Sequence, residues 1–499
     1  MKKILVIIFF ILFLIYPYAY TLSNGPYIIY SLFLLLIILK IKNTIEKRKK
    51  NTQKLQKFNR LQKYYPIIVL VLALVTRISI ATILNDNIEQ VSDFRNALKT
   101  AETLEFNEYY HGFFTHWILL PKITNILFQI FGNSQLVALI FNGIVCSVSA
   151  LLVYLISNVI TKNKNISLLA SLIFILWPAN ILYVVIYTPE HITQLLILLS
   201  IYLIYKGLDK FDKNIINIAT PKRQFIFACL LFFLAGGLLG LTTFFKNFGI
   251  VFVIALFIYF VLDIIFNKCK LKEYVKKHII AFIMVSIGSI LITQITYIYL
   301  DNIVGKKVSR NNMAYFLTIG LNSKNDGTYN TEIAEEYINQ LKESDYNYAL
   351  VNEQKINELI EDIKHNNKLF DLLKNKAKIV AQNDESRLDF VQSSANRNGS
   401  SKTAEIIENV KKFNNFYYMF IWILIGIGIL RFREQINLKI LFLYIGIYGS
   451  YLLLVIIEAQ NRYQYAINPI LCILAALGFE VLLGHKEREQ YLLKESNNS

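Results

Sequence analysis

Two carboxylates stand at places in the chain where a carboxylate could do chemistry. Asp93 follows an apolar run that ends near Leu84, within Val-Ser-Asp-Phe-Arg. Glu190 lies in Tyr-Thr-Pro-Glu-His, which is the whole link between two apolar runs. A positioned carboxylate can take the proton of an attacking hydroxyl, so general-base catalysis is the first chemistry to consider. Simpler interpretations stay open, because Asp93 suits a helix N-cap or solvated loop and Glu190 suits a helix N-terminus.

Three cations occupy equally unusual places. Arg77 is the deepest charge in its apolar run, and Lys246 stands in Phe-Phe-Lys-Asn-Phe-Gly between two apolar runs. Arg462 follows Glu458 and precedes Tyr463 in Ile-Glu-Ala-Gln-Asn-Arg-Tyr. A charge at the centre of an apolar helix costs roughly 2.5–3.5 kcal/mol, so each needs a partner or a purpose. A guanidinium suits phosphate; the alternatives are snorkelling of Arg77 and an i, i+4 pair between Glu458 and Arg462.

Histidines and cysteines give weaker signals. His111, His116 and His191 are possible site residues, although a lone histidine is more often structural. Cys146, Cys229 and Cys472 fall in apolar runs and Cys269 in a basic loop, without the spacing of a metal site. The sequence therefore predicts no cofactor and no metal site, and it leaves a divalent metal open.

The composition identifies the surroundings of these groups. Of 499 residues, 55% are hydrophobic and 17% are charged, and the mean hydropathy is +0.43. Soluble domains carry roughly 25% charged residues, so a soluble globular protein and a disordered chain are both excluded. The apolar runs are about twenty residues long, which is what a helix needs to cross a bilayer. We predict an all-α polytopic membrane protein.

The apolar runs predict about twelve transmembrane helices, with both termini in the cytoplasm. Lys and Arg gather in alternate loops, which is the positive-inside pattern, so the net charge of +17 indicates anionic lipid rather than nucleic acid as the counter-charge. The first run is interpreted as an anchor rather than a cleaved signal peptide. The predicted spans are 4–21, 26–41, 65–84, 135–160, 167–187, 189–205, 224–244, 248–266, 279–300, 414–430, 437–457 and 464–484.

The same pattern divides the chain into five parts. Residues 1–60 form a transmembrane hairpin and basic cytoplasmic loop, and 61–300 form a transmembrane core. Its outer loop, 85–134, is half-apolar and interrupted by Pro121, which favours helices lying in the membrane interface. Residues 301–413 are polar with apolar positions at helical spacing, which predicts a small, mainly helical extracytoplasmic domain. Residues 414–484 are the last transmembrane helices, and 485–499 are a cytoplasmic tail.

In this topology two acids and three cations lie toward the outer side of the membrane. Such a set fits the transfer of a group carried on a lipid phosphate. The lipid tail would stay in the bilayer, the cations would bind the phosphate, and the acids would orient and deprotonate the attacking hydroxyl.

Seven motifs follow one another in order along the chain. They are Thr76-Arg77-Ile78, Ser92-Asp93-Phe94 with Ala97, Pro121, Trp177-Pro178-Ala179-Asn180, Tyr187-Thr188-Pro189-Glu190, Gly320-Leu321-Asn322 with Gly327-Thr328-Tyr329-Asn330, and Glu458, Arg462-Tyr463 and Asn468-Pro469. Through this ordered set the chain resembles the GT-C glycosyltransferases, in particular family 39, which includes protein O-mannosyltransferases and the lipid A aminoarabinose transferase. Two departures are visible: Lys246 stands where relatives often carry Arg beside Pro, and Asp93-Phe94 replaces the Asp-Glu of some mannosyltransferases.

The resemblance implies a bacterial plasma-membrane enzyme with its active site outside the cytoplasm. Its donor would be a polyprenyl-phosphate sugar, linked to undecaprenyl phosphate, and its acceptor a hydroxyl of a cell-envelope glycan, glycolipid or protein. Asp93 would be the general base and Glu190 a second acid that positions donor or acceptor, with inversion at the anomeric carbon. The implied substrate-binding residues are Arg77, Lys246, Arg462, Tyr463, Glu458 and Asn322.

Two other functions fit the same number of spans. A transporter or flippase of lipid-linked sugars is the main alternative, although such proteins usually show internal repeats and charges near the midplane. A membrane scaffold protein without enzymatic activity is the other. The sequence leaves the sugar, the acceptor, the oligomeric state and any separate role of residues 1–60 open.

Overall fold

The computed structural model describes residues 61–107, 112, 114–216, 222–267, 271–310, 312–431 and 438–483. Within these ranges the chain is helical, and no β-strand occurs. The predicted spans 4–21 and 26–41, the C-terminal tail 485–499 and His111 lie outside the described residues. The prediction of an all-α membrane protein is confirmed.

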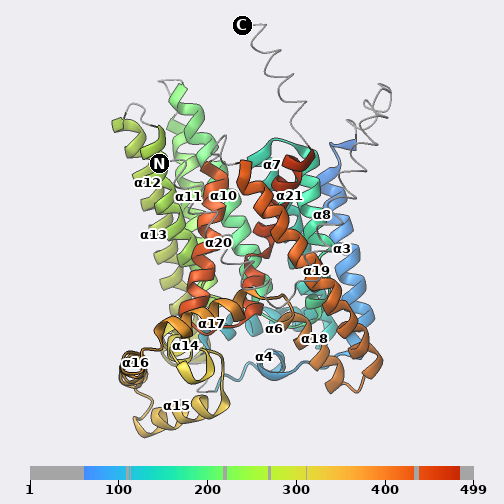
Figure 1. The fold of residues 1–499 in the computed structure, drawn as a ribbon, viewed down its shortest axis with the longest axis vertical. Coiled ribbons are helices and arrows are strands. Elements are labelled where there is room, and N and C mark those ends of the chain that lie inside the picture. Colours follow the sequence, from blue (N-terminus) through green and yellow to red (C-terminus); the bar gives the residue numbers. More distant parts are fainter. Residues whose placement is uncertain are drawn as a thin grey trace.

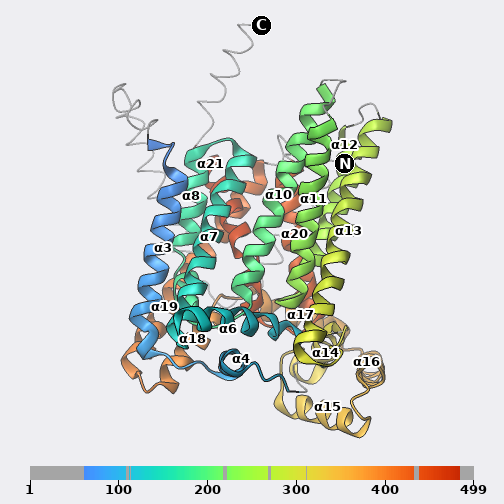
Figure 2. The same cartoon turned by 180° about the vertical axis from the view of Figure 1, so that it is seen from behind.

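Long helices stand side by side as a bundle (Figures 1 and 2). Among the described residues, six helices are long and apolar enough to cross a membrane, or seven if the bent pair α8 and α9 is one span. That pair bends by 64° where Pro178 begins α9, Pro178–Leu182. The count of about twelve spans stays a prediction. The upright helices are α3 (Tyr65–Leu84), α7 (Gln135–Thr161), α8 (Lys164–Ile175), α10 (Glu190–Ile216), α11 (Lys222–Leu241), α12 (Gly249–Asn267), α13 (Leu271–Val304), α19 (Ser401–Arg431), α20 (Leu438–Ile456) and α21 (Asn468–Leu483).

Helix α3 shows how the bundle sorts its residues. Its buried positions recur every four residues, at Tyr65, Val69, Ala73, Arg77 and Ala81. The opposite side of the helix is exposed and apolar, as a lipid-facing surface should be. Arg77 therefore lies on the inward face, where it is fully buried.

Small residues let helices α11 and α13 approach backbone to backbone. A Cβ added at Gly236 would lie 2.0 Å from the carbonyl oxygen of Val285, and one at Gly288 would lie 2.1 Å from that of Phe233. Any side chain at these positions would force the helices apart. Because hydrophobic burial gives little driving force between helices inside a bilayer, such close packing is what holds them together.

Shorter helices lie across one end of the bundle (Figures 1 and 2). The segment 85–134 supplies α4 (Ser92–Thr103), the 3₁₀ turn η2 (Thr115–Trp117) and α6 (Leu119–Phe131). The polar segment 301–413 supplies the rest and is helical, as predicted; its role as a separate extracytoplasmic domain stays a prediction. Its helices are α14 (Asn312–Gly320), α15 (Thr331–Glu343), α16 (Tyr348–His365), α17 (Leu369–Ala381) and α18 (Ser386–Arg397).

A buried polar network ties this domain to the bundle. Arg387 and Asp384 are both fully buried, and Nε of Arg387 donates to Oδ1 of Asp384 at 2.9 Å. Trp177 Nε1, at the break between α8 and α9, donates to Oδ2 of Asp384 at 2.9 Å. Asn414 Nδ2, on α19, donates to the backbone oxygen of Asp384 at 2.8 Å. The Trp177-Pro178-Ala179-Asn180 motif thus anchors the polar domain to the bundle.

Candidate active site

A cavity of 780 Å³ opens at the end of the bundle where the crossing helices lie. It is bounded by α4, α14, α15 and the 3₁₀ turn η6 (Asn461–Ala466). Its lining combines acids, cations and aromatic rings from segments far apart in sequence. The volume lies within the range of roughly 300–1,000 Å³ that is typical of ligand pockets in proteins.

Asp93 lines this cavity from the first turn of α4. The N-cap of α4 is Val91, so the interpretation of Asp93 as a capping residue is wrong. Ser92, next to it, has a φ of 50°, a left-handed conformation that is uncommon for residues other than glycine. Local strain of this kind often marks functional sites, because the surrounding structure must hold it in place. Asp93 is exposed to the cavity and free to meet a substrate.

Arg462 lines the cavity and forms an ion pair with Glu190, which lies behind it. Nε of Arg462 is 3.6 Å from Oε1 of Glu190, and the side chains are 8% and 1% exposed. Oε2 of Glu190 accepts hydrogen bonds from the Tyr183 hydroxyl at 2.5 Å and from Thr188 Oγ1 at 3.1 Å. Glu190 itself is not among the residues that line the cavity. Its contribution to the site therefore runs through Arg462.

Glu458 has a different partner from the one its spacing suggests. It accepts hydrogen bonds from the Tyr463 hydroxyl at 2.9 Å and from Gln460 Nε2 at 2.5 Å. The ion-pair partner of Arg462 is Glu190, so the predicted i, i+4 pair between Glu458 and Arg462 is not formed. The reason is that α20 ends at Ile456 and residues 458–460 are not helical, so Glu458 and Arg462 do not share one face of an α-helix.

Lys246 enters the same cavity from the link between η4 (Thr242–Phe244) and α12. Its Nζ lies 3.6 Å from the centroid of the Tyr463 ring and 5.3 Å from that of Phe316. Desolvation lowers the pKa of Lys246 to about 8, although the nearby Glu190 carboxylate acts in the opposite direction. Lys246 is thus a cation that a bound anion would stabilise.

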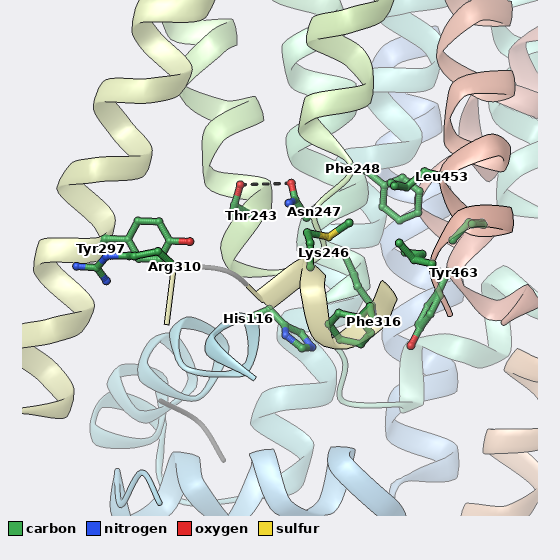
Figure 3. Close-up of a pocket in the computed structure, with 13 residues that line it drawn as sticks. His116, Thr243, Lys246, Asn247, Phe248, Tyr297, Arg310, Phe316, Leu453 and Tyr463 are labelled. Carbon is green, nitrogen blue, oxygen red and sulfur yellow. Dashed lines mark hydrogen bonds between the residues drawn. The ribbon is translucent and has the colours of Figure 1, made fainter. Parts of the chain in front are cut away.

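A second, apolar cavity of 90 Å³ adjoins the first at Lys246 (Figure 3). Four residues line both cavities: His116, Lys246, Phe316 and Tyr463. Desolvation, and then the charges of Lys246 and Arg462, hold the pKa of His116 well below its ordinary value, so this imidazole is neutral at pH 7. The remaining lining of the small cavity is mostly apolar and comes from η4 and the link that precedes α12, and from α13, α14 and α20 together with residues next to them.

Three other predicted site residues are not brought to the cavity. Arg77 lies in the bundle with its guanidinium 5.2 Å from the Phe174 ring centroid. Oδ1 of Asn322 accepts from the backbone N–H of Lys324 at 2.9 Å and so begins the turn η5 (Ser323–Asn325). His191 Nδ1 lies 2.9 Å from the Tyr465 hydroxyl. Arg77, Asn322 and His191 therefore do not line the cavity, and a role for them in the site stays a prediction.

Residues 114–293 match the family model described as dolichyl-phosphate-mannose-protein mannosyltransferase. The chain carries a GT-C glycosyltransferase domain. Its long apolar helices make it a membrane protein. No curated protein has a sequence that matches the chain.

The chain is also similar to solved structures of the oligosaccharyltransferase AglB from Archaeoglobus fulgidus. One is the complex with an inhibitory peptide and a dolichol-phosphate, with a TM-score of 0.48 and 12% identity over 88% of this chain and 52% of that chain. Another is the apo form, with a TM-score of 0.48 and 12% identity over 84% and 50%. The chain thus spans about half the length of these structures.

The GT-C domain supplies only part of the candidate site. His116, Glu190 and Lys246 lie within residues 114–293, whereas Asp93 and Arg462 lie on either side of this range. Among the described residues, no three His, Cys, Asp or Glu side chains gather as a group that could hold a metal ion. The site is therefore completed by segments before and after the matched domain.

Several residues of the site were missed by sequence reasoning. Aromatic rings form much of the wall, and the guanidinium of Arg462 lies 5.1 Å from the Phe94 centroid and 4.6 Å from the Phe390 centroid. Phe94 could have been found as the neighbour of Asp93, but Phe390 lies in the polar domain with no motif around it. The other missed lining residues include Lys99, Trp117, Tyr315, Phe316, Tyr329 and Glu335.

Proposed function

We propose that this protein transfers a sugar from a polyprenyl-phosphate donor, undecaprenyl-linked, to a hydroxyl of an extracytoplasmic acceptor. The acceptor class is a cell-envelope glycan, glycolipid or protein. One observation carries the proposal: Asp93, Lys246 and Arg462 come from separate parts of the chain and line one cavity. An acid that faces two cations across a ligand-sized space is what transfer from a lipid phosphate requires.

The two adjoining cavities suit the two halves of the donor. The phosphate lies between Lys246 and Arg462, where a guanidinium and an ammonium can both donate to its oxygens. The first isoprene units occupy the apolar cavity that begins at Lys246 (Figure 3). The sugar then projects into the larger cavity toward Asp93. This placement keeps the lipid chain against the bundle while the reacting carbon remains accessible to the acceptor.

In the proposed reaction the acceptor oxygen forms a bond to the anomeric carbon, and the bond from that carbon to the phosphate oxygen breaks. Asp93 takes the hydroxyl proton, and the polyprenyl phosphate leaves with the bonding electrons. Attack from the face opposite the leaving group inverts the anomeric configuration. A general base of this kind contributes roughly 10²–10⁴-fold to the rate.

The leaving phosphate gains negative charge as its bond to the sugar breaks. Fixed cations near it are therefore worth more in the transition state than in the ground state, which is the condition for catalysis. By analogy with a lost oxyanion-hole donor, removing one of them costs about 3 kcal/mol in barrier. Glu190 acts as a positioning residue in this scheme, because it holds Arg462 from behind.

We place the cavity on the outer side of a bacterial plasma membrane. Lysines cluster at the opposite end of the bundle, where they are the residues expected in cytoplasmic loops. Among them are Lys162 between α7 and α8, Lys164 at the start of α8, and Lys206 and Lys210 toward the end of α10. The donor sugar would thus be reached from the side where cell-envelope acceptors are found.

The test is transfer of label from a radiolabelled polyprenyl-phosphate sugar to acceptors in membranes that contain the protein. Wild-type membranes should move the label, and Asp93→Asn should lower the rate about 10²-fold or more at equal protein levels. Glu102→Gln, on the same helix, is the matched control and should retain activity. Equal transfer by Asp93→Asn would overturn the assignment of Asp93. Passage of the donor across vesicles without transfer to an acceptor would instead support a flippase.

A further inference from the structure

A third cavity, of 410 Å³, lies beside the candidate active site. It is lined by residues from the end of α17, the start of α18 and the start of η6. Tyr329 and Gln460 line both this cavity and the 780 Å³ cavity. Tyr329 is 52% exposed, and desolvation together with the charge of the nearby Asp93 carboxylate raises the pKa of its hydroxyl. A molecule that reaches Asp93 can therefore continue past Tyr329 into the third cavity.

The charge of the third cavity is negative. Asp389 is paired with Lys411, whose Nζ lies 2.7 Å from its Oδ1. Glu385 accepts hydrogen bonds from the neutral amides of Asn383, at 3.1 Å, and Asn415. Within the described part of the chain no Lys or Arg forms an ion pair with Glu385. One carboxylate is thus left with its charge uncompensated at the cavity wall.

Asn461 adds an independent signal. Its side chain lines the cavity and is only 6% exposed. Its Nδ2 donates to the backbone oxygen of Asn383 at 3.1 Å, but within the described residues its Oδ1 has no hydrogen-bond partner. A buried acceptor without a donor costs about 1–3 kcal/mol, and an O–H or N–H group that reached this oxygen would remove that cost.

We infer that this cavity is an acceptor subsite for a hydroxyl-rich glycan, with a preference for units that carry an ammonium group. The inference rests on the proposed function. Carboxylates and amide oxygens accept hydrogen bonds, so a ligand that binds to Glu385 and Asn461 must carry hydrogen-bond donors. An anionic phosphate polymer would meet the unpaired charge of Glu385 and be repelled. The unit next to the reacting sugar passes over Tyr329 and occupies the subsite while its neighbour presents a hydroxyl to Asp93.

The experiment measures binding of three probes to the full chain in lipid nanodiscs. The probes are a fully N-acetylated chito-oligosaccharide, its de-acetylated cationic form, and a poly(glycerol phosphate) of similar length. The cationic probe should bind most tightly and the polyphosphate should not bind. Glu385→Gln should weaken the cationic probe about tenfold and the neutral probe less than threefold, because only one charge is removed. Glu405→Gln, an exposed acid on α19, should leave all three unchanged.

A second variant guards against loss of fold. Ser386→Phe fills the cavity without altering either carboxylate, and it should weaken both oligosaccharides together. Tightest binding of the polyphosphate, or unchanged binding in both variants with an unchanged melting temperature, would overturn the subsite.

The transfer assay separates this result from the proposed function. If Glu385→Gln raises the acceptor KM while kcat is retained, both inferences stand. If transfer from a polyprenyl-phosphate donor is absent but oligosaccharide binding still depends on Glu385, the function is wrong and the subsite is retained. If transfer occurs and the acceptor KM is unchanged in both variants, the subsite is wrong and the function is retained.

Discussion

Nε of Arg462 lies 3.6 Å from Oε1 of Glu190, a residue 272 positions earlier in the chain, and both side chains are almost fully buried. Arg462 faces the cavity, whereas Glu190 lies behind it and is fixed by Tyr183 and Thr188. A buried ion pair of this kind is weakly stabilising by itself, but removing one partner leaves a costly unpaired charge. The proposed phosphate therefore binds a guanidinium that is already balanced and oriented.

Replacing Glu190 should make the thermal stability of the protein depend on bound polyprenyl phosphate. Glu190→Gln leaves Arg462 buried without its counter-charge, which should reduce stability by about 3–5 kcal/mol. A bound phosphate would restore the balance, so polyprenyl phosphate should raise the melting temperature of the variant more than that of the wild type. Thermal unfolding in nanodiscs, with and without polyprenyl phosphate, measures this. Equal stabilisation of the two proteins would show that no phosphate reaches Arg462.

Activity should fall as the pH rises through about 8. The pKa of Lys246 is lowered to about 8, so the residue loses its proton, and its positive charge, above that value. If this charge binds the phosphate, kcat/KM for the donor should decline above pH 8, because it reports ionisations of the free enzyme. Lys246→Arg should abolish the decline, since arginine stays protonated. A wild-type profile that stays flat to pH 10, or the same decline in Lys246→Arg, would contradict this role.

The tryptophan at the break between α8 and α9 should affect stability and not chemistry. Trp177→Phe removes the hydrogen bond to Asp384 and should reduce stability by about 1.5–3 kcal/mol, because the lost acceptor is charged. The rate per folded molecule should remain within about twofold, because Trp177 does not line the cavity. Denaturation together with active-site-normalised transfer rates checks both parts. A large loss of rate at full stability would mean that the motif acts in catalysis.

Two neighbouring glycines of α11, Gly236 and Gly237, should differ in how much a substitution by alanine lowers the melting temperature. Gly236→Ala places a Cβ 2.0 Å from a backbone oxygen on α13, whereas Gly237→Ala places one 2.9 Å from the movable side chain of Ile292. We expect Gly236→Ala to lower the melting temperature clearly and Gly237→Ala to change it little, because only a side chain can rotate away. Thermal unfolding of the pair measures the difference. A drop of the same size in both would argue against close backbone packing at Gly236.

The sequence by itself determined the class of the protein and the helical nature of its parts. Apolar runs of membrane-spanning length and the polar, helically spaced segment 301–413 are local properties, so hydropathy and spacing were enough to predict them. The choice of Asp93, Lys246 and Arg462 as candidate site residues also followed locally, because a charge beside an apolar run needs a partner or a function.

Only the tertiary structure decided which of these charges meet. Arg77 and Arg462 looked alike in sequence, but Arg77 lies on the inward face of α3 away from the cavity, whereas Arg462 reaches the cavity from η6. Arg462 pairs with Glu190 and not with Glu458, because the chain between Glu458 and Arg462 is not α-helical. Such pairings depend on how distant helices pack and turn, and neither residue spacing nor hydropathy contains that information.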